Sequence, residues 1–284
     1  MNELNLSDSW LKKSLLYIPL VTWAIITVIP FLYMLVLATK GRAEIFQFPP
    51  PILFNSTAIE GASVNYTNLL NETRFWSNFF ISIYISGLAT VFSLFFCSLA
   101  GYSFAVYEFK GKEALFRFMI ITMMIPAVVS IVPYFAEMKY FDWLNLPRAL
   151  YLPIVANAYG VFLMRQFIQA SISKAVVEAA RIDGATEFKI YWMIALPMLK
   201  PALGTLGIIT FLSSWNDFMR SLVIMTEKQN YTVPVALNMM KGMQTVDYGA
   251  IMIGATISTM PIILIFIFLS KWIISRLTDG AIKG

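Results

Sequence analysis

The chain has 284 residues, of which 58% are hydrophobic and 13% are charged, and its mean hydropathy is +0.71. This composition is more apolar than that of soluble domains and excludes an ordinary soluble globular fold. The chain contains no His and a single Cys. Zinc sites built on Cys and His, His-based acid–base catalysis and an intrachain disulfide are therefore excluded.

Six apolar windows predict transmembrane helices, because a bilayer core about 30 Å thick requires roughly 20 helical residues. In chain order the windows cover about 15–38, 77–103, 117–136, 149–168, 199–219 and 249–274. The first window follows Lys12 and Lys13 without a small-residue cleavage site, so we interpret it as an uncleaved signal anchor rather than a signal peptide. The predicted class is an all-α integral membrane protein with six transmembrane helices.

The distribution of basic residues predicts the orientation of these helices. With a cytoplasmic N-terminus, thirteen of the 21 Lys and Arg residues lie in the inside segments, whereas the 16 acidic residues divide equally between the two sides. The net charge of +5 then lies entirely inside, as the positive-inside rule expects. We therefore predict that both termini are cytoplasmic.

The longest predicted cytoplasmic loop, about 169–198, is unusually rich in charge for this chain. Ser173 is placed to cap a helix over 174–183. Glu178 and Arg181 are three positions apart in that helix, so we expect them to form an ion pair.

A second short helix is predicted immediately after the first. Gly184 is suited to the position just after the first helix, where a left-handed backbone conformation often ends a helix. The next helix is expected to start near Thr186. It should end at the break formed by Leu196 and Pro197. Two helices of this length are marginal in water, so the element should dock on another surface.

The docking surface could be a protein or the lipid headgroups. The expected apolar face of the first helix, Val177, Ala180 and Ile182, is too small for strong binding to lipid. Ala179 and Ala180 would instead permit close approach of another protein, which we favour.

Polar and aromatic residues inside the predicted helices are candidates for a substrate pathway, because such groups are costly in lipid and tend to face a cavity. Aromatic rings together with amides and carboxylates can bind a polar solute that passes through such a cavity. Each candidate could instead have a structural role, Tyr84 and Tyr134 as core or interface aromatics and Asp217 by pairing with Arg220. The candidates are Asn78, Tyr84, Tyr134, Asn157, Tyr159, Trp215, Asn216 and Asp217.

Three sequence patterns resemble those of one transporter family. Glu178-Ala179-Ala180, Gly184 and Ile194-Ala195-Leu196-Pro197 match every fixed position of the EAA loop, E-A-A-x3-G-x9-I-x-L-P, of ABC importer permeases. Residues 215–218 (WNDF) and 279–284 (DGAIKG) are similar to the carbohydrate-importer branch, and to its maltose-type permease with the shorter periplasmic portion. Lys174 departs from the proline that opens the loop helix in many relatives.

This resemblance implies a type I ABC permease fold, with residues 1–284 as a single six-span domain in a bacterial inner membrane. The EAA loop would act as a coupling helix on a cytoplasmic ATPase, Gly184 setting the bend and Pro197 the angle into the fifth span. The implied coupling residues are Glu178, Ala179, Ala180, Arg181, Asp183, Gly184, Leu196 and Pro197.

The resemblance also implies partners. These are a second homologous permease, two ATP-binding cassette subunits that hold the ATP and magnesium, an extracytoplasmic solute-binding protein and a carbohydrate substrate, with no cofactor or metal on this chain and no nucleic acid. The outside loop 226–248 would reach into the binding protein, the alternative being an ordinary connector. The outside segment 39–76 would pack on the outer face of the transporter or touch the binding protein. The implied contact residues are Asn238, Met239, Met240, Lys241 and Gly242.

Alternative functions remain open at this point. The solute could be a polyol phosphate rather than an oligosaccharide. A secondary transporter would need an ion-coupling carboxylate or His deep in a span and usually an inverted repeat, and the sequence displays neither. A membrane-embedded enzyme would lack a candidate acid–base pair.

Overall fold

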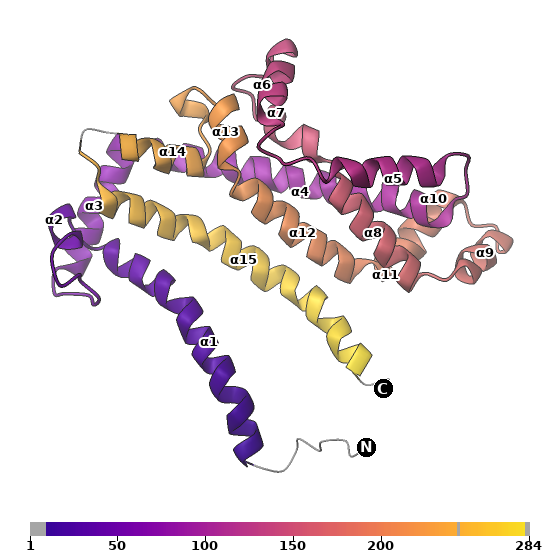
Figure 1. Cartoon of the computed structure of the whole chain (residues 1–284), viewed down its shortest axis with the longest axis horizontal. Coiled ribbons are helices and arrows are strands. Elements are labelled where there is room, and N and C mark those ends of the chain that lie inside the picture. Colours follow the sequence, from indigo (N-terminus) through magenta and orange to yellow (C-terminus); the bar gives the residue numbers. More distant parts are fainter. Residues whose placement is uncertain (1–9, 243–244, 282–284) are drawn as a thin grey trace. The chain divides into compact units, whose positions relative to one another are not determined.

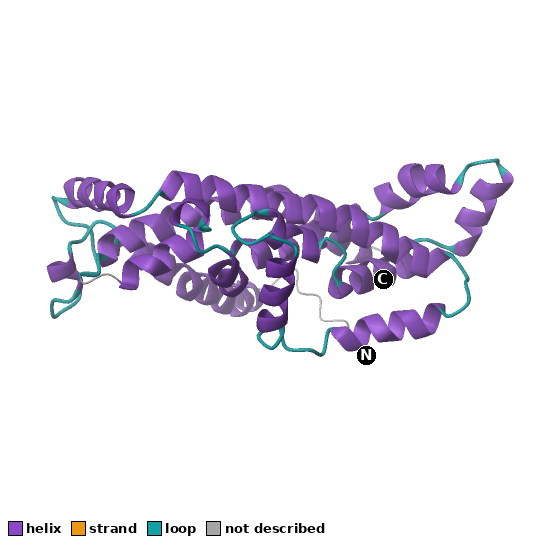
Figure 2. Cartoon of the chain, turned by 90° about the horizontal axis from the view of Figure 1, so that it is seen from above, coloured by secondary structure: helices purple, strands orange, loops and turns teal. Residues whose placement is uncertain are grey.

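The structure, a computed structural model, describes residues 10–242 and 245–281 (Figure 1). Within these ranges the backbone forms helices and turns but no strand (Figure 2). The last three residues of the C-terminal DGAIKG pattern lie outside the described residues. The α-helices are α1 (Trp10–Leu37), α2 (Arg42–Ile45), α3 (Ala58–Glu72), α4 (Phe75–Val106), α5 (Lys112–Thr122), α6 (Ile131–Tyr140), α7 (Arg148–Tyr151), α8 (Ala158–Ser171), α9 (Lys174–Ile182), α10 (Glu187–Ile190), α11 (Leu196–Met198), α12 (Lys200–Trp215), α13 (Phe218–Ile224), α14 (Val233–Met239) and α15 (Tyr248–Ala281). The short 3-10 and π segments are η1 (Leu152–Ile154), η2 (Tyr191–Ala195), η3 (Lys228–Asn230) and η4 (Met240–Gly242).

Three described helices are long and apolar enough to cross a membrane: Leu15–Leu37 within α1, Phe75–Val106, and Tyr248–Ser270 within α15. A fourth candidate is the pair Glu187–Met198 and Lys200–Trp215, which is bent by 78°. These helices coincide with the first, second, sixth and, in part, the fifth predicted window. The prediction of an all-helical membrane protein is confirmed, whereas six continuous spans are not found in the described ranges.

The third and fourth predicted windows are each interrupted. In the third, α5 ends at Thr122 and α6 begins only at Ile131, with Pro126 between them. Proline disfavours the helical conformation of the residue that precedes it, which explains the break. In the fourth, Asn157 adopts an extended backbone and caps α8, so the helix restarts there.

The chain divides into two compact units, which are described separately. The first contains the described parts of Met1–Thr73 and Met239–Ser258, and the second those of Arg74–Asn238 and Thr259–Gly284. In the first unit, the buried amide of Asn65 in α3 donates to the carbonyl oxygens of Ala38 and Lys40, at 2.8 and 3.0 Å. The end of α1 is thereby tied to α3.

The second unit is built around α4, which packs against α8 and α12. Small residues permit this close packing. A Cβ atom at Gly101 of α4 would lie 2.6 Å from Met164 Cβ, and one at Gly160 of α8 would lie 2.6 Å from the sulfur of Cys97. Cys97 is fully buried there, as expected of a small apolar residue.

Candidate functional site

The predicted two-helix loop is present, and its turn has the geometry that the sequence indicated. Gly184 has φ of +78°, and its N–H donates to the carbonyl of Arg181 at 3.0 Å. The N–H of Ala185 donates to the carbonyl of Ala180 at 3.0 Å. These two bonds form a Schellman motif, which satisfies the last carbonyls of α9 and requires a left-handed residue. Glycine adopts that conformation without steric strain.

The starts of both helices lie where they were predicted. Ser173 occupies the N-cap position of α9, although its side chain makes no capping hydrogen bond. Thr186 caps α10, and its hydroxyl accepts from the N–H of Lys189 at 3.4 Å. The reversal at Gly184 therefore separates two helices that start independently.

The ion pair of the loop differs from the predicted one. Arg181 binds Glu187 rather than Glu178, with Nε to Oε1 at 2.6 Å and Nη2 to Oε2 at 3.2 Å. The turn at Gly184 brings the first residue of α10 back to the last turn of α9, and the planar guanidinium matches the carboxylate in a two-pronged contact. The Tyr107 hydroxyl, immediately after α4, donates to Glu187 Oε2 at 2.8 Å. We call Tyr107, Arg181 and Glu187 the loop strap.

The electrostatics of the loop strap keep its hydrogen bonds in place at neutral pH. The hydrogen bond from Arg181 lowers the pKa of the Glu187 carboxyl below its usual value. Burial, together with the hydrogen bond to Glu187, raises the pKa of Tyr107 to about 12. Glu187 is therefore ionised and Tyr107 remains a donor at pH 7. The Arg181–Glu187 pair therefore contributes fully to stability at a pH above the ordinary pKa of a carboxyl group. This contribution is lost as the pH falls through the lowered pKa of Glu187.

The apolar face of α9 is only partly the one predicted. Val177 and Ala180 are buried at 3% and 8% exposure and pack with Ile168 and Ile172 of this chain. Ile182, however, is 87% exposed, because α9 ends there and the reversal points it away from the packed side. Ala179 is also exposed, so it is the small residue available to another protein, whereas Ala180 is used internally.

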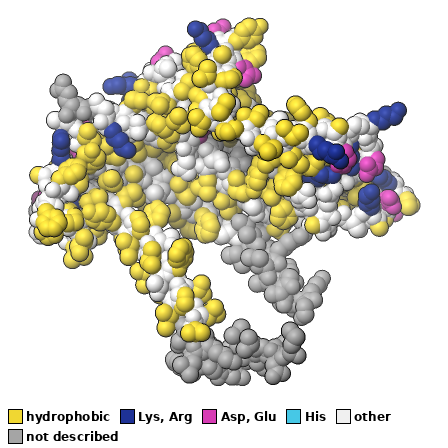
Figure 3. Space-filling view, in the orientation of Figure 1, with side chains coloured by type: hydrophobic (Ala, Val, Ile, Leu, Met, Phe, Trp, Pro, Cys, Tyr) yellow, Lys and Arg dark blue, Asp and Glu magenta, His cyan; other side chains and the backbone are white. Residues whose placement is uncertain are grey.

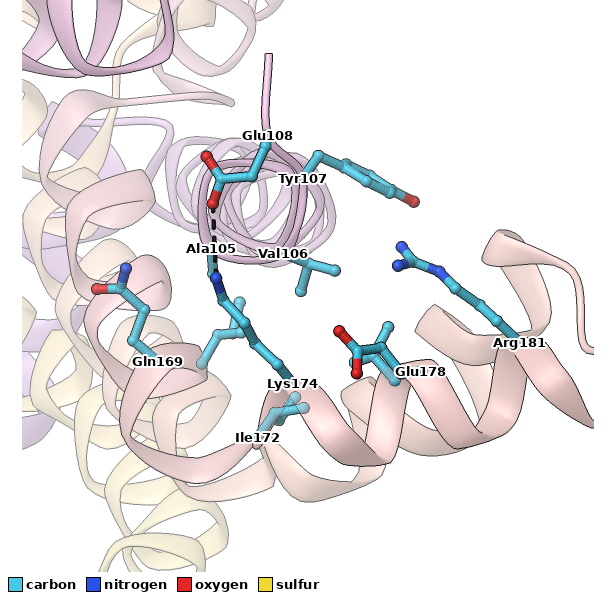
Figure 4. Close-up of a pocket in the computed structure, with 11 residues that line it drawn as sticks. Ala105, Val106, Tyr107, Glu108, Gln169, Ile172, Lys174, Glu178 and Arg181 are labelled. Atoms are coloured by element: carbon cyan, nitrogen blue, oxygen red, sulfur yellow. Dashed lines mark ion pairs between the residues drawn. The ribbon is translucent and has the colours of Figure 1, made fainter.

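A cleft of about 270 Å³ separates α9 from the end of α4 (Figure 4). Lys174, Glu178 and Arg181 project from α9 toward it, and the Lys174 ammonium lies 3.7 Å from the Glu108 carboxylate. Glu178 thus lies beside this cleft and is not the partner of Arg181. The cleft is lined by Ala105, Val106, Tyr107, Glu108, Ile168, Gln169, Ile172, Lys174, Val177, Glu178 and Arg181.

The second helix of the loop bends later than predicted. Pro197 lies within α11, which directly continues the π-helical segment η2, so the chain is still helical there. The 78° bend occurs at Leu199, between α11 and α12. Pro201 lies in the first turn of α12, where a backbone N–H has no partner within the helix, so its absence costs no hydrogen bond. A proline at 201 would clash with the carbonyl of residue 197 in a continuous helix, so the break forms between the two prolines.

Two of the predicted pathway residues are brought together in a cleft of about 510 Å³. Tyr134 and Asp217 line it with Arg220. Asp217 pairs with Arg220, Oδ2 to Nε at 2.5 Å, and also caps α13. The Tyr134 hydroxyl donates to the carbonyl of Ala149. The alternative that Asp217 pairs with Arg220 is thus confirmed, and Arg220 is a cleft residue that the candidate set omitted.

The other pathway candidates are separate from this cleft, and several have structural contacts. The buried Asn78 donates to the carbonyls of Lys228 and Tyr231, at 3.2 and 2.8 Å. Asn157 accepts from the N–H of Gly160 at 2.7 Å as the cap of α8. Trp215 is buried and stacks on Phe211, Tyr84 makes an edge contact with Tyr151, and Tyr159 and Asn216 are exposed.

The first two predicted contact residues lie at the end of α14, which runs from Val233 to Met239. A single 3-10 turn, Met240–Gly242, follows it. Met240 is buried, whereas Lys241 and Gly242 are exposed and Met239 is 38% exposed. Three of the five predicted contact residues therefore present exposed side chains or backbone.

Sequence comparisons show the family to which the chain belongs. Residues 93–279 match the family described as binding-protein-dependent transport system inner membrane component. The chain is 34% identical over 221 residues to an arabinooligosaccharides transport system permease of Bacillus subtilis, covering 78% of each chain. It is 32% identical over 280 residues to the trehalose/maltose transport system permease of Thermococcus litoralis, covering 96% of this chain and 98% of the relative.

A solved structure shares the fold. It is described as a bacterial ABC transporter involved in the import of the acidic polysaccharide alginate. The TM-score is 0.78 at 22% identity, and the match covers 90% of this chain and 94% of the other. The chain belongs to the binding-protein-dependent permease family and is a transmembrane component of an ABC importer.

Proposed function

We propose that this permease imports an oligosaccharide or a related carbohydrate and provides half of the translocation pathway. The observation that carries the proposal is the two-helix loop, in which the turn at Gly184 and the loop strap hold α9 and α10 together as one charged element. The names of the relatives support carbohydrate as the solute class, because they refer to arabinooligosaccharides, trehalose and maltose.

The exposed side of the loop contacts an ATP-hydrolysing partner. Ala179 permits close approach, and Ile182 and Phe188 offer exposed apolar side chains, at 87% and 65% exposure. Glu178 and Asp183 provide polar contacts beside them, while Leu196 and Pro197 continue the helix toward the bend. ATP and magnesium belong to the partner subunits, and in the described part of this chain no three His, Cys, Asp or Glu residues form a metal-binding group.

The remaining architecture follows the family resemblance. The chain forms a single six-span domain with cytoplasmic termini, the broken segments at α5–α6 and α7–α8 serving as two of the spans. A second permease supplies the other half of the pathway, and two ATPase subunits dock on the two loops. The solute-binding protein contacts the segment 238–242.

The Tyr134, Asp217 and Arg220 cleft is the part of this chain that contacts the solute on its path. A carboxylate, a guanidinium and a phenol ring are suited to the hydroxyl groups and apolar faces of a sugar. The cleft lies where α12 ends and α13 begins, so a change in the angle of α12 would alter it.

The function is tested by reconstituting the permease with its partner permease, ATPase and binding protein in lipid, and measuring ATP hydrolysis across a panel of oligosaccharides and polyol phosphates. Stimulation by one class of oligosaccharide supports the proposal. Stimulation only by a polyol phosphate would leave an importer but overturn the carbohydrate assignment. Uptake driven by an ion gradient without any ATPase would overturn both.

Breaking the loop strap should uncouple the importer without unfolding it. Arg181→Glu or Glu187→Arg places like charges together, and we expect substrate-stimulated ATP hydrolysis to fall about fivefold, equivalent to about 1 kcal/mol. The double variant, Arg181→Glu with Glu187→Arg, restores the opposite charges and should recover most of the stimulation.

The control is another ion pair of the same unit, Arg165 with Glu113 at 3.2 Å, in which the Glu113 side chain is 60% exposed and the Arg165 side chain 12% exposed. Glu113→Gln should leave stimulation unchanged, because this pair lies outside the loop and the exposed carboxylate is replaced by an amide whose oxygen can still accept from Arg165. Equal losses in Glu113→Gln and Glu187→Arg would show that the loop strap has no special role, as would a double variant that is no better than the single ones.

A further inference from the structure

The segment that follows α2 in the first unit is an exposed apolar hairpin. Residues 46–54 read FQFPPPILF and contain no charged side chain. Phe48 is 96% exposed, Leu53 74% and Ile52 70%. Hydrophobic side chains gather over this region of the molecular surface (Figure 3). Such a concentration of exposed apolar side chains marks a binding surface for a protein or a membrane.

The hairpin folds back along the end of α1. Pro50 and Ile52 share an apolar groove of about 450 Å³ with Ile29, Leu32, Tyr33 and Val36 of that helix. The apolar span of α1 runs to Leu37. At 1.5 Å per residue, Ile29 lies about 12 Å before this end, so the hairpin lies beside the span rather than beyond it.

The backbone of the hairpin is suited to a medium without water. Pro49, Pro50 and Pro51 have no N–H group. A backbone donor without a partner is costly in lipid, and three consecutive residues here have none to satisfy. The hairpin can therefore enter an apolar layer at lower cost than an ordinary loop of the same length.

The charged residues lie at the base of the hairpin. Glu44 accepts from the N–H of Gly41 at 3.0 Å and from the amide of Asn55 at 3.3 Å. Its carboxylate is also 3.7 Å from the ammonium of Lys40. Because Glu44 and Asn55 bracket residues 46–54, these contacts close the hairpin at its polar end and leave the apolar end free.

We propose that residues 46–54 form a membrane anchor that inserts among lipid acyl chains in the leaflet where α1 ends. Phe48, Ile52 and Leu53 lie in the acyl region, and the groove beside α1 accommodates an acyl chain. Lipid rather than a soluble protein is the occupant, since the groove lies alongside the last two turns of a membrane span. The absence of charge in the hairpin means that its binding does not depend on the headgroup.

The anchor is tested by measuring its depth with nitroxide labels in the complete importer. The single cysteine, Cys97, is replaced by alanine, the partner chains are made cysteine-free, and Phe48→Cys or Leu53→Cys is labelled in lipid nanodiscs. The accessibility of each label to oxygen, which concentrates in lipid, is compared with its accessibility to a water-soluble nickel chelate. We expect an oxygen-to-nickel ratio several-fold above that of Ile59→Cys, which is 87% exposed at the start of α3.

The reference for lipid contact is Ile26→Cys, on the exposed middle of α1. A Phe48 label that responds to nickel like Ile59 would place the hairpin in water and overturn the proposal. A label inaccessible to both reagents would place it against another protein and would also overturn it. Should the cysteine variants fail to assemble, photoactivatable phospholipids can label the unmodified chain, and modification within residues 46–54 is expected.

Discussion

Gly184→Pro is expected to abolish substrate-stimulated ATP hydrolysis while the permease still inserts and assembles. Proline fixes φ near −65°, whereas Gly184 has φ of +78°. The substitution also removes the N–H that binds the carbonyl of Arg181. A forced non-glycine backbone here carries strain of about 1–3 kcal/mol, which the short helices can relieve by abandoning the turn. The reversal that aligns Arg181 with Glu187 would then be lost.

Two controls separate the turn from a general effect of proline. Gly184→Asn should retain most of the stimulation, because Asn tolerates the left-handed conformation better than other non-glycine residues. Gly111→Pro introduces the same conflict at φ of +83°, outside the loop. If Gly111→Pro uncoupled ATP hydrolysis as strongly as Gly184→Pro, or if Gly184→Pro retained normal stimulation, the assigned role of the loop would be wrong.

The second large effect is expected where α4 meets α8. Alanine at Gly101 would place its Cβ 2.6 Å from Met164 Cβ and 2.9 Å from the backbone nitrogen of Arg165. Neither atom is the end of a flexible side chain, so the helices must separate. Overpacking of this kind costs about 1–3 kcal/mol, and we expect a lower thermal midpoint in detergent and less assembled complex.

Gly87→Ala provides the matched control within the same helix, because a Cβ atom there meets nothing within 4 Å. Its midpoint should remain unchanged or rise slightly, since alanine is a better helix former than glycine. A midpoint for Gly101→Ala equal to that of Gly87→Ala would show that α4 and α8 do not pack as closely as described.

Local chemistry predicted the loop well. The left-handed glycine and the start of α10 at Thr186 depend on only three or four neighbouring residues, and both are confirmed. The ion pair of Arg181 was assigned wrongly because helix spacing favoured Glu178, whereas the chain reversal brings Glu187 closer. Only the path of the chain after the glycine distinguishes the two partners, although Glu187 lies in the same charged stretch.

The roles of the polar residues in the predicted spans were harder to predict, because they also depend on the path of the chain. A polar residue in a span signals that it needs a partner, but the partner lies far along the chain. Asn78 finds its acceptors at Lys228 and Tyr231, about 150 positions later. The sequence therefore indicated that Asn78 mattered without distinguishing a solute contact from a structural bond. Arg220 entered only as a possible partner of Asp217, and its place in the cleft required the fold.

The contact of Tyr107 with Glu187 links the end of α4 to the two-helix loop. One end of this helix is tied to the two-helix loop, and near its other end Asn78 binds the segment 228–231. Its 32 residues form a rod about 48 Å long. If the loop is displaced so that α4 tilts by about 5°, the far end moves by about 4 Å over that length. A small rotation of α4 at the loop would thus be converted into a displacement of several ångströms at its far end. A displacement of that size could open or close a passage for a solute.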